Sequence, residues 1–273
     1  MRSARLSLVA VFAIVTSLHA QSKTTILTGS AAARRFAYQG QPLHPFCLEF
    51  SQERSSRSAR SDLVMCSAAN VSPKREDNGW WSAAYPTGAG DPSFSRSAYV
   101  SYTVLASKGN RFLVATNSSG GGSGNFSNLF WVRLDDRWIA LVKDERAGDR
   151  CAGGLSDYKA QGTVVTFSVN VSSGAVLELT GVPVDKGVSG KLNGSYVDCD
   201  GVATYRYDLK AEKAQLTDVR IRPPDTRAGT VPTLPQSCFN QLVAQYAKRG
   251  PVSLKPGALK EFGRQFAARC AAR

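Results

Sequence analysis

The middle of the chain alternates apolar and polar residues with a period of two, which is the pattern of half-buried β-strands. These segments are rich in β-branched and aromatic residues. They predict strands over 99–105, 111–116, 129–134, 138–142, 163–169 and 204–209. The three residues Asp135-Asp136-Arg137 suit a hairpin loop between two of them. We therefore expect a mainly β protein, with an antiparallel, sandwich- or barrel-like β body over 21–221.

Glycine, serine and asparagine interrupt the predicted strands and predict turns. These turns fall at Lys108-Gly109-Asn110, Ser172-Ser173-Gly174 and Leu192-Asn193-Gly194. The longer glycine-rich stretch 117–125 matches no phosphate-binding spacing, and no helical pattern follows it. We expect it to connect two strands.

The C-terminal part changes to a helical period. Two apolar stripes at helical spacing follow one another, Cys238, Leu242, Val243, Tyr246 and then Leu259, Phe262, Phe266, Cys270. Gly250-Pro251 separates them, and Pro256 is suited to the first turn of the second helix. The pattern predicts a helical hairpin over 236–273, joined to the β body by a proline-rich linker over 222–235.

The N-terminus has the pattern of a secretory signal peptide over residues 1–20. Arg2 and Arg5 precede an apolar run from Leu6 to Leu18, and the small residue Ala20 precedes the expected cut. The run is too short to span a membrane, and no second apolar run follows, so we expect no transmembrane segment. The sequence thus predicts a bacterial protein that is periplasmic or secreted.

The chain has six cysteines, all after the predicted cut. An even number in an exported protein, without a CxxC pair, favours three disulfides over a metal site. If 46–50 and 63–66 form a hairpin, Cys47 lies level with Cys66. In an antiparallel helix pair, Cys238 lies beside Cys270. The third pair, Cys151 with Cys199, follows by elimination only, and other connectivities remain open.

Charge is concentrated near the C-terminus of a chain whose net charge is +13. Ten basic residues lie between Arg220 and Arg273, against the acidic residues Asp225 and Glu261. Such a basic surface suggests a partner that is a protein or an anionic envelope polymer. The alternative is a solvated helical face. The candidate contact residues are Lys248, Arg249, Lys260 and Arg264. Nucleic acid is not expected, since no basic-aromatic recognition motif is present.

A second candidate binding surface is aromatic. Trp80 and Trp81 are adjacent, and Tyr85 follows four residues later. In an extended chain, neighbouring side chains point to opposite faces, so one indole is expected in the core and the other at a binding surface. Burial of both is the alternative.

Catalytic motifs are weak. Only His44 remains after the predicted cut, and Ser156 with Lys159 matches Ser-x-x-Lys without the other elements of that enzyme class. The carboxylate pairs are Asp135 with Asp136, Asp144 with Glu145, and Asp198 with Asp200. We expect no cofactor and no metal site.

The sequence therefore favours an exported, non-catalytic binding protein of the cell envelope, as an inhibitor or immunity-like partner of an envelope-targeting enzyme. Two alternatives remain open. One is an envelope hydrolase that uses carboxylates or Ser156 with Lys159. The other is a structural or anionic-polymer-binding component held by the basic residues.

Overall fold

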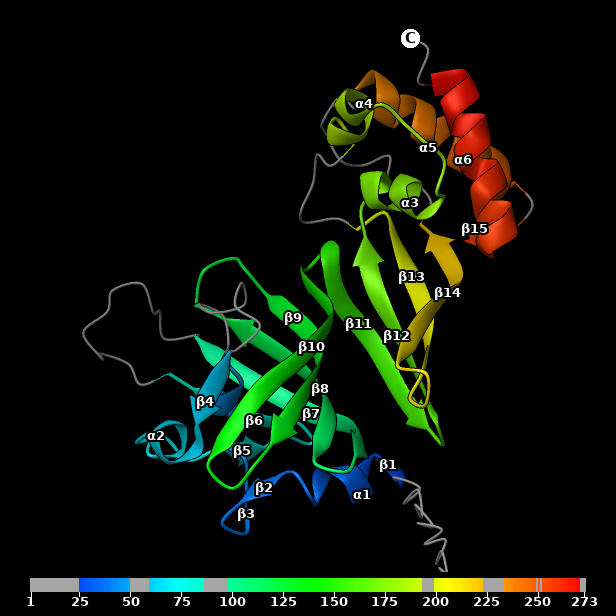
Figure 1. Ribbon diagram of the computed structural model, residues 1–273. Helices are drawn as coiled ribbons and strands as arrows, with labels where there is room; N and C mark the ends of the chain where they lie inside the picture. The colour runs from blue at the N-terminus through cyan, green and yellow to red at the C-terminus, as the bar shows by residue number, and fades with distance from the viewer. Residues whose placement is uncertain are drawn as a thin grey trace, which may run out of the picture.

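The computed structural model describes residues 25–49, 59–85, 98–192, 199–222, 233–248, 250 and 252–270. Within these residues, thirteen strands join in one antiparallel sheet (Figure 1). The strand order is β15-β14-β13-β12-β11-β10-β9-β8-β7-β6-β5, with β1 added beside β7 and β4 beside β10. The predicted antiparallel β body is confirmed. The predicted signal peptide lies outside the described residues.

The sheet follows the chain order, as a succession of hairpins does. Its strands are β1 (Ile26–Thr28), β4 (Arg60–Asp62), β5 (Lys74–Arg75), β6 (Trp81–Ala84), β7 (Tyr99–Lys108), β8 (Arg111–Ser119), β9 (Phe126–Leu134), β10 (Trp138–Asp149), β11 (Ala152–Gln161), β12 (Val164–Val171), β13 (Gly201–Asp208), β14 (Lys213–Ile221) and β15 (Val252–Leu254). β2 (Ala37–Tyr38) and β3 (Gln41–Pro42) form a separate ribbon. The predicted loop between β9 and β10 is confirmed, because Leu134 pairs with Ile139 across it.

The central strands β7, β8 and β9 are apolar on both faces because both faces are covered. One face presents Phe112 and Phe130 to the N-terminal segment, where Phe36 completes a first core. The other face presents Leu113 and Leu129 to a second core, shared with β12, β13 and the C-terminal helices. Alternate residues of one strand thus serve two cores.

The sheet turns a sharp corner between β10 and β11. The two strands pair only at Asp149 and Ala152, and β11 then runs close to β7 and β9. Gly148 and Gly153 allow this corner: a Cβ atom on Gly148 would lie 2.3 Å from the carbonyl carbon of Gly153. Two register shifts within β10 add the bulges that bend a strand. The corner separates the β5–β10 part of the sheet from the β11–β15 part (Figure 1).

Two segments that the sequence pattern predicts as strands, 46–50 and 63–66, form helices over their described residues. The first is the 3-10 helix η1 (Pro45–Leu48), and the second is α2 (Leu63–Ser67). The Asp62 carboxylate accepts hydrogen bonds from two backbone N–H groups in the first turn of α2, so an N-cap overrides the β preference. The hairpin argument for the first disulfide is therefore wrong.

All three predicted disulfides are nevertheless present, and no cysteine is free. They join Cys47 to Cys66, Cys151 to Cys199 and Cys238 to Cys270. Disulfides of this kind persist in oxidising compartments, which indicates a non-cytoplasmic protein. Among the described residues, no helix is both long enough and apolar enough to span a membrane.

Helices pack at one end of the β12–β15 part (Figure 1). They are α3 (Ser173–Leu179), α4 (Lys186–Gly190), α5 (Leu234–Ala247) and α6 (Pro256–Cys270), while α1 (Ser30–Ala33) lies beside β1 and β7. The expected turn at 172–174 is wrong: Ser172 caps α3 by accepting a hydrogen bond from the Ala175 N–H group.

The C-terminal helices pair as the two apolar stripes predict. Between them lies a strand that was not predicted, β15, which pairs with β14 and ties the helices to the sheet. Helix α5 begins at Leu234, within the stretch predicted as a linker. Residues 223–232 of that stretch, and the predicted turn residues Asn193 and Gly194, lie outside the described residues.

Candidate functional site

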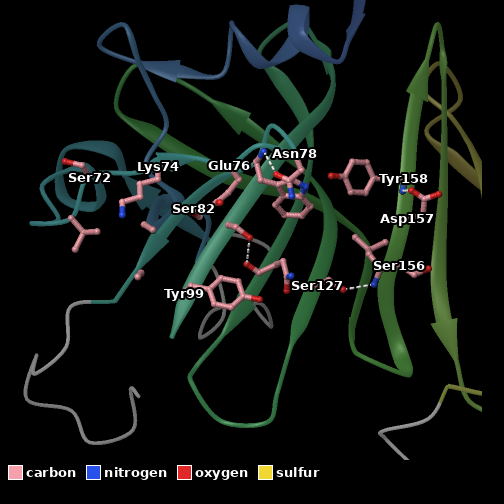
Figure 2. Close-up of a pocket in the computed structure, with 17 residues that line it drawn as sticks. Ser72, Lys74, Glu76, Asn78, Ser82, Tyr99, Ser127, Ser156, Asp157 and Tyr158 are labelled. Carbon is pink, nitrogen blue, oxygen red and sulfur yellow. Dashed lines mark hydrogen bonds between the residues drawn. The ribbon is translucent and has the colours of Figure 1, made fainter. Parts of the chain in front are cut away.

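A cleft of about 900 Å³ lies between the β5–β6 hairpin and β11, with β7, β8 and β9 as its floor (Figure 2). Its volume is near the upper end of the range for ligand sites in proteins. The corner between β10 and β11 creates it, because the corner places β11 opposite β6 instead of flat beside β10.

The floor of the cleft is a polar row on an otherwise apolar face. Ser101, Asn117 and Ser127 are aligned in register on β7, β8 and β9, and all three line the cleft. The same face of β8 carries the core residue Leu113 further along the strand. The Ser127 hydroxyl accepts a hydrogen bond from the Leu155 N–H group at 2.6 Å, which fastens β11 to this floor.

Asn117 contributes an unsatisfied acceptor. Its Oδ1 atom is buried from solvent and accepts no hydrogen bond within the described part of the chain. Its backbone carbonyl is engaged, because the Ser101 hydroxyl donates to it at 3.2 Å. A buried acceptor without a donor costs free energy. The Asn117 side chain as a whole is half-buried and lines the cleft, so a ligand can contact the part of it that is not covered.

Trp80 is presented to the cleft by a tight turn. The Gly79 N–H group donates to the Glu76 carbonyl at 2.9 Å, and the Glu76 N–H group donates to the Trp80 carbonyl at 2.8 Å. The Asn78 side chain accepts from the Trp80 N–H group at 3.0 Å. Gly79 has a φ of 84°, a conformation that favours glycine. The turn therefore fixes the direction of the indole.

The Trp80 ring meets the Tyr158 ring of β11. Their centroids are 5.8 Å apart and their planes are tilted by 60°. Burial raises the pKa of the Tyr158 hydroxyl, although a hydrogen bond with Trp80 opposes the change. Both side chains are half-buried, so part of each ring stays open to a ligand.

Within the described residues, the lining of the cleft is not basic, although the whole chain is. Its described charged residues are Lys74, Glu76 and Asp157. The Glu76 carboxylate accepts a hydrogen bond from the Ser82 hydroxyl within the same wall. Anionic molecules therefore find no cluster of positive charge in this cleft.

The structure separates the three aromatic residues predicted as a binding surface. Trp80 lines the cleft, whereas Trp81 packs against the core on the opposite face of the sheet. Tyr85 stacks on Phe46, with ring centroids 4.5 Å apart. Burial, together with a hydrogen bond to Glu49, raises the pKa of Tyr85. Of the three, Trp80 alone belongs to the cleft.

The predicted basic residues lie on the C-terminal helices and do not line the cleft. Lys248, Lys260 and Arg264 are exposed, and Arg264 pairs with Glu261 at 3.2 Å. Arg249 lies outside the described residues.

Changing both Lys260 and Arg264 to serine should leave the free energy of unfolding within about 0.5 kcal/mol of wild type, because both side chains are exposed. If this face binds anionic polymer, the double variant should bind polygalacturonate more weakly and with a flatter salt dependence. Isothermal titration at several salt concentrations measures both. Lys159→Ser, an exposed change on β11, is the control. Unchanged affinity and salt slope would identify a solvated helical face.

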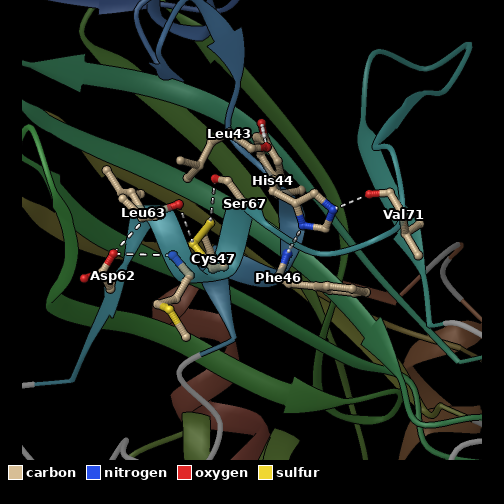
Figure 3. The surroundings of a disulfide bond; sticks show 12 residues. Leu43, His44, Phe46, Cys47, Asp62, Leu63, Ser67 and Val71 are labelled. Atoms are coloured by element: carbon tan, nitrogen blue, oxygen red, sulfur yellow. Dashed lines mark hydrogen bonds between the residues drawn. A yellow bond between two sulfur atoms is a disulfide. The ribbon is translucent and has the colours of Figure 1, made fainter. Parts of the chain in front are cut away.

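The residues considered for catalysis are not assembled in the cleft. His44 is buried, with Nε2 2.7 Å from the Val71 carbonyl oxygen and Nδ1 accepting from the Phe46 N–H group (Figure 3). Both ring nitrogens are thus occupied in holding the start of η1. Ser156 lines the cleft, but Lys159 does not.

Three of the carboxylates considered at the sequence level have structural partners: Asp135 pairs with Arg133, and Glu145 and Asp200 accept hydrogen bonds. Glu145 accepts a hydrogen bond from the Tyr207 hydroxyl, and Asp200 accepts from the backbone and hydroxyl of Ser173. Asp198 lies outside the described residues. Within the described ranges, no group of three or more histidine, cysteine, aspartate or glutamate side chains is placed to hold a metal ion.

The sequence analysis missed most of the cleft lining, including Glu76, Asn117, Asp157 and Tyr158. Asn117 had a usable signal, because it interrupts the apolar positions of one strand face. The others come together only through the corner between β10 and β11, which no local pattern encodes.

Comparisons with protein-family models, curated proteins and solved structures give no match for this chain. The chemistry of the cleft is therefore the basis for assigning a function.

Proposed function

We propose that this protein is an exported, non-catalytic binding protein of the bacterial cell envelope, and that the cleft between β6 and β11 holds its ligand. The main support is the convergence of the Trp80 and Tyr158 rings with a polar floor, which includes Asn117, in one cleft. Concave sites that combine aromatic surface with a few polar groups are typical of ligand binding. Location in the periplasm or outside the cell is part of the proposal, supported by the three disulfides.

The non-catalytic part of the proposal is supported by the engagement of His44 and by the separation of Lys159 from the cleft. With an enzyme as its ligand, such a protein is an inhibitor or an immunity-like partner. With a wall polymer as its ligand, it is a binding component of the envelope. Both belong to one class, a binding protein that uses this cleft.

A photo-crosslinking experiment tests the proposal. A benzophenone side chain placed at Ser156, which is exposed and lines the cleft, should give a specific adduct when the purified protein is irradiated in native envelope extract. The same group at Lys159, exposed on the same strand but outside the cleft, should not. Equal labelling at both positions, or at neither, would contradict a ligand in the cleft.

An envelope hydrolase is the second candidate, because two carboxylates and a hydroxyl line the cleft: Glu76, Asp157 and Ser156. Paired carboxylates are the groups that cleave glycosidic bonds. Incubation with purified cell-wall fragments distinguishes the two functions. Release of new reducing ends by the wild type, and its loss in Glu76→Gln and Asp157→Asn, would replace the binding function by catalysis. Intact fragments support the binding function.

A further inference from the structure

The floor of the cleft is polar, although the same sheet face is apolar elsewhere. Leu113 and Leu129 occupy this face under the helices and belong to the core. At the cleft the face changes to Ser101, Asn117 and Ser127. Ser127 also fastens β11 through the Leu155 N–H group, whereas Asn117 leaves its Oδ1 atom buried and unpaired, which destabilises the free protein. A polar floor of this kind is expected where a polar ligand contacts it.

The lining also indicates which chemical groups that ligand carries. The partly open rings of Trp80 and Tyr158 lie beside hydroxyl and amide groups, so one ligand meets flat apolar surface and polar groups together. A sugar ring has that character, because its C–H face is apolar and its rim carries hydroxyl groups. A wholly apolar ligand would leave the serine and asparagine groups without partners.

The charged groups of the described lining disfavour anionic ligands in this cleft. They are two carboxylates, Glu76 and Asp157, and one ammonium group, Lys74. A phosphate or uronate polymer would meet a net negative lining, whereas neutral hydroxyl groups can donate to both carboxylates. The basic residues of α5 and α6 lie outside the lining and do not alter this balance.

Resting on the proposed binding function, we infer that the ligand of this cleft is a neutral oligosaccharide. A pyranose ring packs against Trp80 and Tyr158, and sugar hydroxyl or acetamido groups form hydrogen bonds with the polar side chains that line the floor, including Asn117. The carboxylates of Glu76 and Asp157 accept from further hydroxyl groups. The cleft volume of about 900 Å³ fits several linked rings.

Isothermal titration with defined tetrasaccharides tests the inference. The panel holds β-1,4-linked N-acetylglucosamine, β-1,4-linked glucose, α-1,4-linked glucose and, as the anionic counterpart, tetragalacturonate. At least one neutral member should bind with a Kd below about 1 mM, and its affinity should be insensitive to salt, because no ion pair is formed. Binding should quench tryptophan fluorescence through Trp80. Binding of tetragalacturonate alone would overturn the inference.

Substitutions of cleft residues test whether the saccharide binds in this cleft. Trp80→Ala and Asn117→Ala should each weaken the affinity at least tenfold. Trp138→Ala is the matched control, since Trp138 is a half-buried tryptophan that stacks with Arg60 and does not line the cleft. Equal affinity in wild type and both cleft variants would also overturn the inference. If Trp80→Ala does not fold, Asn117→Ala and the wild-type titration still test whether the saccharide binds in the cleft.

The binding function and the oligosaccharide inference can be contradicted separately. If no neutral tetrasaccharide binds while the Ser156 adduct still forms in envelope extract, the oligosaccharide inference is wrong and the binding function stands. If neither the adduct nor saccharide binding is observed, both are wrong.

Discussion

Gly148→Ala is expected to destabilise the folded protein by about 3 kcal/mol, which is the cost of forcing atoms into a closely packed site that cannot relax. The new Cβ atom would lie 2.3 Å from the Gly153 carbonyl carbon and 2.4 Å from the Ala152 oxygen. These are backbone atoms of the facing strand, and no rotamer change moves them away. Urea denaturation followed by tryptophan fluorescence measures the loss.

Gly120→Ala is the matched control, because a Cβ atom at Gly120 meets no atom within 4 Å and the φ there is not in the left-handed region. It should unfold at the same urea concentration as the wild type. If Gly148→Ala also did so, β10 and β11 would not cross as closely as described. The corner that shapes the cleft would then need another explanation.

The six predicted strands and the two C-terminal helices follow from local alternation and helical stripes, which is why the sequence alone was sufficient for them. β11 begins with Ala152, Gly153 and Gly154, and carries few β-branched residues. Its pairing with β12 stabilises it as a strand. A short stretch of sequence contains no information on such pairing, so the strand could not be predicted from it. Neither of the two strands that frame the cleft, β6 and β11, is among the six predicted strands.

The candidate site likewise combines residues that a local pattern indicates with residues that only the tertiary fold brings together. For Trp80 and Trp81, the sequence predicted only that one indole enters the core and the other lies at a surface, since adjacent side chains on a strand point to opposite faces. The structure places the two indoles against different cores, in agreement with that argument. Tyr158 and Asn117 reach Trp80 only because the sheet turns at Gly148. A pattern of two or four residues cannot encode a contact between positions 80 and 158.

The two parts of the sheet are also joined through a charged network at the turn between β13 and β14. The Glu212 carboxylate accepts hydrogen bonds from Lys108 at 3.1 Å and from both terminal nitrogens of Arg111 at 2.9 Å. Lys143 of β10 donates to the Glu212 backbone carbonyl at 3.0 Å. The Arg111 guanidinium also lies over the Trp131 ring, 5.1 Å from its centroid. Residues from β7, β8 and β10 thus converge on one residue, Glu212, of the opposite part.

Burial alone would raise the pKa of Glu212, but the hydrogen bonds from Arg111 and Lys108 outweigh it and hold this pKa below its ordinary value. The folded state therefore binds a proton less readily than the unfolded state does. The resulting stabilisation is fully present above the pKa of the unfolded state, about 4.3, and is lost as the pH falls through the lower folded-state pKa.

Glu212→Gln should accordingly lower the free energy of unfolding by about 2 kcal/mol at pH 7, within the range for hydrogen bonds to charged groups. The difference from wild type should shrink as the pH falls below about 4, because the wild-type carboxyl also becomes neutral there. Glu261→Gln is the control: Glu261 pairs with Arg264 on an exposed face of α6, where solvent screens the pair. Urea denaturation at pH 7 and pH 3 measures both variants. A pH-independent deficit in Glu212→Gln would mean that the amide disturbs packing at the turn, and that the charge of Glu212 does not join the two parts of the sheet.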